Sequence, residues 1–289
     1  MLNGVLVVGL VIAGAAAGSL GLLADAGHNL ADVGALTLTI LAVRLAARPA
    51  TPRRSFGWHR ATVLAAQANA VTLLVVSVLI VVEAIRRLVH PMAVDGGVVI
   101  AMALVALVVN ALASRVVRTS GRDLAMRSAM LHLLGDAAAS GAVLIAGIVI
   151  TLSPGARWFD PAASLLVAVT VAYHAAVLLR EVVGVLLEAM PVGLDEDVIV
   201  AALTNVKGVE SVHDVHVWSL SSEVRALAAH VVMSGHPTLE EAQLVVGKMR
   251  AVLGERFDIA HATIEQECEA CDAHGADACA IADSPVRSL

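Results

Sequence analysis

Two copies of the pattern His-x-x-x-Asp lie inside strongly apolar stretches of the chain. The first is His28-Asn-Leu-Ala-Asp32 and the second is His132-Leu-Leu-Gly-Asp136. A spacing of four residues places both side chains of a pair on one helix face, one turn apart. Two imidazoles and two carboxylates suffice for a tetrahedral Zn²⁺ site. Ionisable groups inside a membrane are costly and usually line an ion path. We therefore favour a metal site over two separate polar clusters that neighbouring helices satisfy.

Further side chains that can bind metal occur in the last third of the chain. They are His213, His216, His230, His261 and Glu267. Imidazole nitrogen and carboxylate oxygen are the common ligands of Zn²⁺ beside thiolate. We expect these residues to gather at one end of a small sheet, although His216 has the alternative of pointing into the sheet interface.

All cysteines of the chain follow this region, at Cys268, Cys271 and Cys279. Three cysteines in one short segment are not the disulfide framework of a secreted protein. Cys-x-x-Cys has metal-ligand spacing, but one such pair is not a closed site. Three interpretations stay open: the pair completes the metal site of the preceding region, captures zinc for a transport function of the chain, or belongs to a reduced, disordered tail.

The composition indicates a membrane protein. The 289 residues are 58% apolar and only 15% charged, and the mean hydropathy is +0.84, whereas soluble domains are about a quarter charged. A helix needs about 20 apolar residues to cross about 30 Å of hydrocarbon. Six stretches approach that length, which predicts a bundle of six transmembrane helices near residues 3–21, 27–47, 61–82, 97–117, 129–152 and 161–179. Because the first stretch begins almost at Met1 without a basic segment, we expect no cleavable signal peptide.

Charge divides the chain and predicts its orientation. Residues 1–190 carry a net charge of +4, with arginine and no lysine, and residues 191–289 carry −10. Arginines concentrate after the second and fourth stretches, so these connections should be cytoplasmic, as should both termini. Arg86 and Arg87, after the third stretch, run against this rule. The acidic C-terminal part disfavours nucleic acid as a partner and suits cations.

The pattern beyond residue 190 predicts a small α+β domain. Residues 195–204 and 238–257 indicate helices, and Thr238 with Glu241 forms a capping box for the second one. Residues 209–220, 224–233 and 261–267 alternate and are rich in β-branched side chains, which is typical of strands. The order αββαβ suggests a ferredoxin-like unit with helices on one face of an antiparallel sheet. We therefore expect a transmembrane domain at 1–190, a soluble domain at 191–267 and a mobile tail at 268–289.

Several motifs together resemble the cation diffusion facilitator family of divalent-metal transporters. The resemblance covers nearly the whole chain. It rests on Leu-Leu-Ala-Asp25-Ala-Gly-His28-Asn-Leu-Ala-Asp32, Phe56-Gly-Trp-His59-Arg60-Ala, Glu83-Ala-Ile-Arg86-Arg87-Leu, His132-Leu-Leu-Gly-Asp136, Val212-His213-Asp-Val-His216-Val-Trp218 and Ala229-His230-Val. Because the first stretch begins almost at Met1, we expect no N-terminal cytoplasmic extension like that of many relatives, and the connection between the fourth and fifth stretches has no histidine-rich segment.

This resemblance implies a zinc exporter of the cell membrane. His28, Asp32, His132 and Asp136 match the transport site, and the two-His, two-Asp set resembles zinc-selective members that also carry cadmium or cobalt. The family exchanges metal for protons and forms homodimers through the soluble domain. There, His213, His230, His261 and Glu267 match metal-binding positions, and zinc would also act as a regulatory ligand. His59 lies in a loop that the family places against the soluble domain, where a secondary metal site and an ordinary loop histidine are both open.

The sequence also leaves open alternative functions for the chain and alternative roles for two of its residues. An intramembrane metalloprotease needs an open coordination position, and the chain has no His-Glu-x-x-His motif. A non-transporting metal sensor, and an exporter of another divalent metal, are further alternatives. Asp25 either attracts a departing cation or caps the start of its helix. We expect His174, alone in the sixth stretch, to be a packing residue that faces the bundle.

Overall fold

The computed structural model describes residues 2–120, 124–153, 155–221 and 223–269, without the side chains of residues 2–3, 113–120 and 124–133. Contacts divide the chain into two units. The first unit comprises Met1–Leu41 and Ala65–Arg180, and the second comprises Ala42–Leu64 and Glu181–Leu289.

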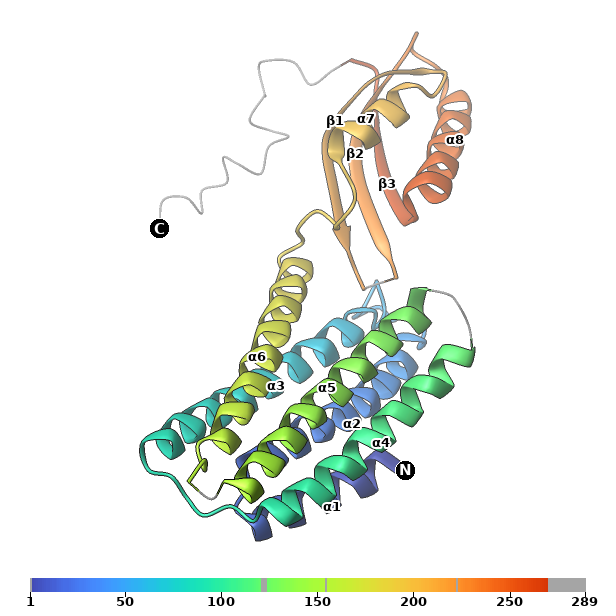
Figure 1. Ribbon diagram of the computed structural model, residues 1–289. Coiled ribbons are helices and arrows are strands. Elements are labelled where there is room, and N and C mark those ends of the chain that lie inside the picture. Colours follow the sequence, from blue (N-terminus) through green and yellow to red (C-terminus); the bar gives the residue numbers. More distant parts are fainter. Residues whose placement is uncertain (1, 121–123, 154, 222, 270–289) are drawn as a thin grey trace. The chain divides into compact units, whose positions relative to one another are not determined.

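Long helices form the first unit and extend into the second (Figure 1). They are α1 (Leu2–Ala17), α2 (Leu20–Ala46), α3 (Arg60–Val89), α4 (Gly96–Ser120), α5 (Leu124–Leu152) and α6 (Phe159–Leu186). Among the described residues, α2, α3, α6 and the segment Leu134–Leu152 of α5 are long and apolar enough to cross a membrane. The apolar segments of α1 and α4, Gly4–Ala17 and Gly96–Leu112, are shorter. The predicted helical bundle is thus confirmed, with four clear spans.

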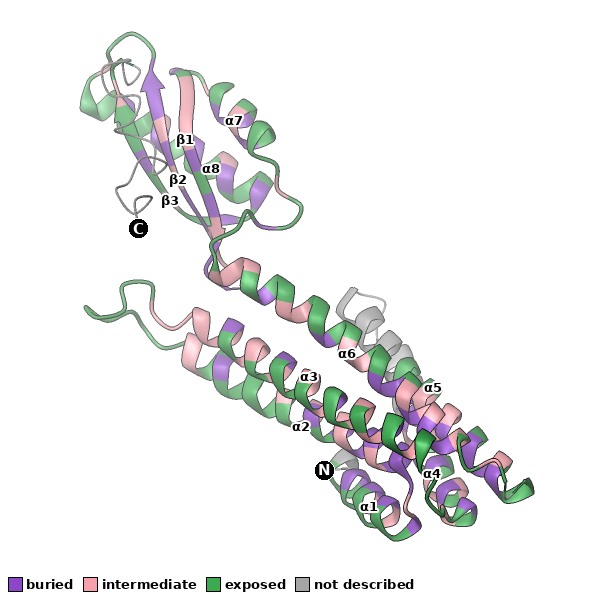
Figure 2. Cartoon of the chain, turned by 90° about the vertical axis from the view of Figure 1, so that its left-hand side faces the viewer, coloured by how far each residue is buried: buried purple, intermediate pink, exposed green. Residues whose placement is uncertain are grey.

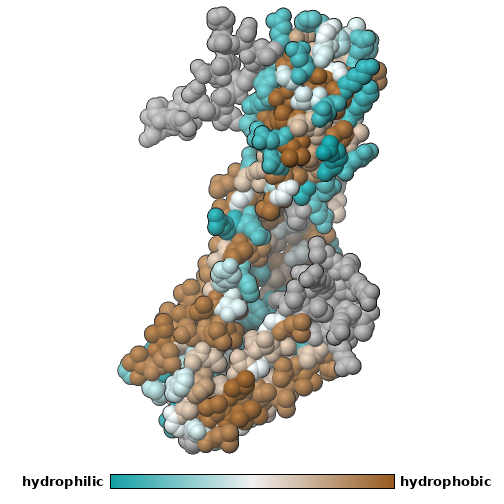
Figure 3. Space-filling view, turned by 45° about the horizontal axis from the view of Figure 1, so that its top comes forward, coloured by the Kyte–Doolittle hydropathy of each residue, from teal (hydrophilic) through white to brown (hydrophobic). Residues whose placement is uncertain are grey.

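The outer surface of these helices is apolar. Val75, Leu79 and Val82 of α3 are each more than half exposed, and similar side chains follow α2. Exposed turns recur along both helices in Figure 2, and Figure 3 shows an extended hydrophobic surface over the helices. Monomeric soluble proteins rarely expose apolar patches larger than a few hundred Å². This surface therefore suits contact with lipid.

A buried carboxylate fixes the start of α2. Asp160, at the start of α6, is fully buried and accepts hydrogen bonds from the Ser19 hydroxyl at 2.5 Å and the Leu20 backbone N–H at 2.8 Å. The Ser19 hydroxyl in turn accepts from the Leu22 N–H. These contacts satisfy N–H groups that an α-helix leaves without intrahelical partners. They tie α6 to the helix that carries His28 and Asp32.

Close backbone contact holds α5 against α4. A Cβ atom at Gly147 of α5 would lie 2.9 Å from a methyl of Val99 and 3.2 Å from the Ile100 backbone nitrogen, both on α4. Small residues allow such close approach of helices in membranes. Val99, Ala103 and Val143 are buried where the two helices meet. The helix that carries Asp136 is therefore fixed by packing.

The second unit contains a three-stranded sheet with two helices. Its elements are α7 (Glu196–Thr204), β1 (Val209–Ser219), β2 (Arg225–Met233), α8 (Leu239–Phe257) and β3 (Ile259–Glu267). This order confirms the predicted αββαβ pattern. The sheet order is β1-β2-β3, with β2 antiparallel to β1 and parallel to β3. The prediction of an antiparallel sheet was therefore wrong for the second pair, because α8 is a crossover that returns the chain to run alongside β2.

Helix α8 packs on the sheet through a continuous core. Its buried residues Met249 and Leu253 join Leu203 of α7 and Leu227 of β2, all without measurable exposure. The capping box predicted at Thr238 and Glu241 is confirmed, because each side chain accepts a hydrogen bond from the other residue's backbone N–H. These contacts lower the pKa of Glu241 below its ordinary value, since hydrogen bonds from Thr238 favour the charged carboxylate.

Candidate functional site

Helices α2 and α5 bring three metal-binding side chains together, which we call the helix site. His28 and Asp32 lie one turn apart on α2, and Asp136 projects from α5. His28 Nε2 is 3.0 Å from Asp136 Oδ1 and 3.6 Å from Asp32 Oδ2. One ligand atom from each residue lies within 4.8 Å of the other two. The second His-x-x-x-Asp motif thus approaches the first from a different helix.

The fourth predicted residue of this group, His132, has a side chain outside the described part of the structure. Its place in the sequence is one helical turn before Asp136 within α5. This placement mirrors His28 before Asp32 on α2. The assignment of His132 as a ligand stays a prediction.

The helix site is chemically suited to a borderline divalent cation. An imidazole nitrogen and two carboxylate oxygens converge where the side chains of Asp136, His28 and Asp32 are 8%, 15% and 25% exposed. Buried carboxylates need a compensating cation or hydrogen bonds. Imidazole with carboxylate suits Zn²⁺, whereas Mg²⁺ and Mn²⁺ favour oxygen-rich sites. The residues present therefore fit Zn²⁺ as a substrate.

Asp25 does not have the capping role considered from the sequence, because α2 begins at Leu20. It is almost fully buried, and it accepts hydrogen bonds from Asn29 Nδ2 at 2.9 Å and from the Ser140 hydroxyl at 3.1 Å. The cap of α2 is formed instead by Ser19 and Asp160, so the capping role was wrong. Through Ser140, Asp25 joins α2 to α5 beside the helix site.

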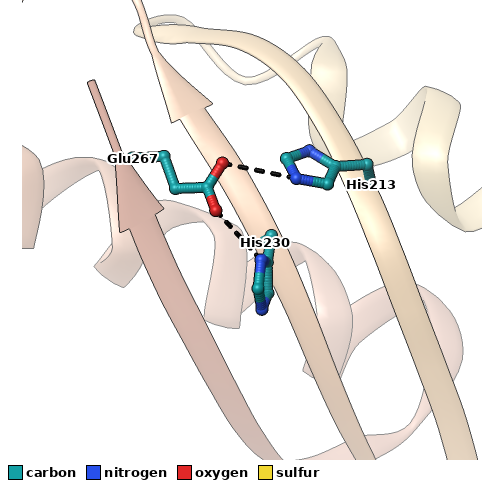
Figure 4. A group of neighbouring side chains, drawn as sticks. All are labelled: His213, His230 and Glu267. Atoms are coloured by element: carbon teal, nitrogen blue, oxygen red, sulfur yellow. Dashed lines mark hydrogen bonds and ion pairs between the residues drawn. The ribbon is translucent and has the colours of Figure 1, made fainter. Parts of the chain in front are cut away.

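Three strands assemble a second group, which Figure 4 shows and which we call the sheet cluster. His213 on β1 is paired in register with His230 on β2, and Glu267 ends β3. Glu267 lies between the two rings, with Oε1 2.9 Å from His230 Nδ1 and Oε2 3.3 Å from His213 Nε2. The arrangement offers two imidazoles and one carboxylate from three different strands.

Two acidic residues near the sheet cluster were not predicted as site residues from the sequence. Asp214 Oδ2 and Glu265 Oε2 each lie 3.5 Å from His230 Nε2, and Asp214 Oδ1 lies 3.0 Å from His216 Nε2. Glu265 precedes Glu267 by two, so strand periodicity could have placed it on the same face. Asp214 could not be found in that way. It has a left-handed backbone (φ 49°) at an irregularity of the pairing between His213 and His216.

Among the described residues, the remaining predicted ligands are not grouped with the sheet cluster. His261 is near the opposite end of β3, where it pairs with Ala226. Its ring is nearly perpendicular to that of Phe56, with the two ring centroids 5.4 Å apart. Six residues of a strand span about 20 Å, so His261 and Glu267 are distant. His59 lies in the turn before α3 and joins no metal-binding group of the described residues. Cys268 is exposed directly after β3, and Cys271 is outside the described residues.

Comparison with known protein families covers both parts of the chain. Residues 1–187 match the cation efflux transmembrane domain, and residues 191–269 match the cytoplasmic domain of cation efflux proteins. The chain belongs to the cation efflux family. The resemblance to cation diffusion facilitators is thereby confirmed, and the chain is a multi-pass membrane transporter rather than a metalloenzyme.

Individual members of the cation efflux family align with most of the chain. The zinc transporter ZitB of Escherichia coli is 38% identical over 271 residues, which are 92% of this chain and 84% of that protein. A cadmium, cobalt and zinc/H(+)-K(+) antiporter of Bacillus velezensis is 34% identical over 90% of this chain and 83% of its own length. The proton-coupled zinc antiporter SLC30A2 of Mus musculus is 29% identical over 95% of this chain and 78% of its own length.

Proposed function

We propose that the chain exports Zn²⁺, with Cd²⁺ and Co²⁺ as further substrates, from the cytoplasm in exchange for protons. The observation that carries the proposal is the convergence of His28, Asp32 and Asp136 from two helices within 4.8 Å. His132 supplies the fourth ligand and completes a tetrahedral set. The names of the aligned zinc transporters and proton-coupled antiporters support this assignment.

The contacts of His28 suggest how exchange occurs. Its Nε2 atom faces one carboxylate oxygen of Asp136 and one of Asp32, at 3.0 and 3.6 Å. Metal binding requires a deprotonated imidazole, and departure of the metal leaves two carboxylates beside a group that accepts a proton. Protons taken up there lower the affinity for metal, so a gradient of protons drives its release. The bundle alternates between inward and outward states whose affinities for the cation differ.

The arginine distribution supports cytoplasmic termini. The connection after α2 contains Arg48, Arg53 and Arg54, in agreement with an orientation that leaves positive loops inside. Arg87, an apparent exception, is only 12% exposed and pairs with Glu83 at 2.8 Å while it donates to the Gly18 carbonyl. Its charge is paired with Glu83 within the protein, so it is weak evidence for the orientation of the adjoining loop.

We assign the sheet cluster a regulatory role. Zn²⁺ bound by His213, His230 and Glu267 would fix the ends of three strands together. The match to the cytoplasmic domain supports a homodimer formed by residues 191–267, with 1–190 as the transport domain. The tail, 268–289, begins with Cys268 next to Glu267, so Cys268 and Cys271 are candidates to extend the cluster. His59 stays a secondary candidate.

Flux measurements in proteoliposomes test the proposal. The full chain is reconstituted with a pH-sensitive dye inside, and Zn²⁺, Cd²⁺, Co²⁺ and Mn²⁺ are offered in turn. Zinc entry coupled to proton movement, abolished in Asp136→Ala, is expected. Asp95→Asn is the matched control, because Asp95 is exposed and accepts from the Gly97 N–H at the start of α4, away from the helix site. Absence of flux for every metal, with zinc still bound, would favour a non-transporting sensor.

A further inference from the structure

A cavity of about 570 Å³ lies beside the helix site. His28, Asp32 and Asp136 line it, and helices α3 and α6 complete its wall. From α6 the lining residues include Val167, Thr170 and His174, which are spaced by three and four residues. This spacing corresponds to one face of a helix, so a single face of α6 borders the path beside the metal ligands.

His174 is the ionisable residue that α6 presents to this cavity. It lies near the middle of α6 and is exposed, whereas its neighbour Ala175 is buried. His174 thus faces the other helices, as expected, but the expectation that it packs against them was wrong, because it is exposed. Its ring has one neighbouring ring, Tyr173 at 5.7 Å, and no hydrogen bond or ion pair to any residue that the structure describes. Thr170 on the same face is different, because its hydroxyl donates to the Leu166 carbonyl.

The position of His174 in the middle of a membrane-spanning helix is energetically costly, which indicates a functional role. An ionisable side chain in the middle of a spanning helix is expensive and usually faces a water-filled path. Nothing in the described packing compensates His174, and the cavity it borders already holds three metal-binding groups. Asn69 of α3 lines the same cavity and offers a neutral amide oxygen. The cavity is thus lined by further side chains able to bind a cation, outside the helix site.

We propose that His174 is a further cation-binding residue of the transport path, which coordinates Zn²⁺ at a second position in the cavity. The proposal rests on the proposed transport function. A neutral imidazole binds Zn²⁺ without adding negative charge to an apolar cavity, so the cation is held more weakly than between two carboxylates. Conduction through several weak positions allows an ion to enter and still leave. His174 therefore eases transfer of the cation to and from the helix site.

Cysteine substitution tests contact between His174 and the cation directly. In a full-length background with Cys268, Cys271 and Cys279 replaced by Ser, His174→Cys is compared with Tyr173→Cys in proteoliposomes. Tyr173 is the matched control because it is 66% exposed and does not line the cavity. Alkylation by a maleimide is timed with and without Cd²⁺. We expect Cd²⁺ to slow labelling at position 174 by about tenfold, the low end of effects at metal sites, and to leave position 173 unchanged.

Transport by substituted chains gives a second readout. His174→Ala and His174→Gln should lower kcat/KM for zinc by about tenfold. His174→Cys should raise the ratio of Cd²⁺ to Zn²⁺ flux above that of the parent, because a thiolate favours the softer metal. Equal Cd²⁺ protection at both positions, or unchanged kcat/KM in both His174→Ala and His174→Gln, would overturn the role of His174. Absence of zinc flux in the unsubstituted full chain would instead overturn the proposed function.

Discussion

The helix site and the sheet cluster use the same ligand types on two different scaffolds. In the helix site, one turn of α2 supplies His28 and Asp32, and Asp136 comes from a neighbouring helix. In the sheet cluster, three strands supply one residue each, and Asp214, His216 and Glu265 lie beside them. Among the side chains that the structure describes, the helix site thus has three ligand groups beside a cavity, while the sheet cluster has three ligand groups with further acids at a sheet end.

Similar residues on these two scaffolds suit the different purposes proposed for them. A transported cation must be released, so a small donor set that protons can occupy is adequate. The cation proposed for the sheet cluster has only to hold strands together, and extra carboxylates would increase its affinity. Glu265 is 67% exposed, whereas the carboxylates of the helix site are at most 25% exposed. If this comparison is right, equivalent substitutions in the two groups will have different effects.

The largest effect is expected for His28→Asp. Replacing an imidazole with a third carboxylate makes the helix site oxygen-rich, which favours Mn²⁺ over Zn²⁺. We expect zinc flux to fall by about 100-fold, at the upper end of losses at altered metal sites, and the ratio of manganese to zinc flux to rise. The matched control is His230→Asp in the sheet cluster, which should leave the ratio of the two fluxes unchanged in the same proteoliposome assay. A change of the ratio in both variants would contradict the division of roles.

The next effect concerns stabilisation by zinc. At a free zinc concentration 100 times Kd, binding should stabilise the second unit by about 2.7 kcal/mol. His230→Ala removes the ring that contacts Asp214, Glu265 and Glu267, so this stabilisation should be lost. Thermal unfolding of the full chain, in the Asp136→Ala background to remove the helix site, measures the effect. Zinc-dependent stabilisation of the same size in both chains would show that the sheet cluster does not bind.

A smaller effect is expected for Thr238→Ala, which removes the cap of α8. Loss of such a cap costs about 1 kcal/mol of unfolding free energy. Folding lowers the pKa of Glu241, so the contribution of its carboxylate is complete above the unfolded pKa and is lost as the pH falls through the lower folded pKa. The difference between Thr238→Ala and the parent should therefore shrink below about pH 4, near the ordinary pKa of glutamate. Denaturant titrations at neutral and acidic pH measure it; a difference that grows on acidification would contradict this account.

The smallest effect is expected for His261→Ala. His261 pairs with Ala226, near the end of β3 opposite Glu267, so zinc stabilisation should match that of the parent. Calorimetric titration of zinc into both chains, with the helix site disabled by Asp136→Ala, compares their affinities. Weaker zinc binding in His261→Ala would contradict this prediction and show that His261 contributes to zinc binding.

The two groups also differ in how far the sequence could predict them. His28 and Asp32 could be paired because helical geometry is local, and four residues always make about one turn. The contact of these residues with Asp136 could be predicted only because a second motif of the same spacing occurs in another helix. In the sheet, the pairing of His213 with His230 depends on register, and the approach of Asp214 depends on a local irregularity with φ 49°. Neither is encoded in residue spacing, and for the same reason His261 was expected at the wrong end of the sheet.

Long-range polar contacts were similarly hidden from the sequence. Asp160 and Ser19 are more than a hundred residues apart, yet their hydrogen bond fixes the start of α2. The order of helices and strands was predictable because hydrophobic period and length are local properties. The parallel pairing of β2 and β3 was not, since it depends on how α8 returns the chain across the sheet.

A reciprocal flux and binding measurement tests the central claim most directly. Asp136→Ala and a His213→Ala, His230→Ala double variant are reconstituted side by side, and zinc flux and zinc stoichiometry are measured on each. We predict that Asp136→Ala loses proton-coupled flux and keeps zinc at the sheet cluster, while the double variant loses that zinc and still transports at saturating zinc. Zinc flux that survives in Asp136→Ala but disappears in the double variant would contradict the account.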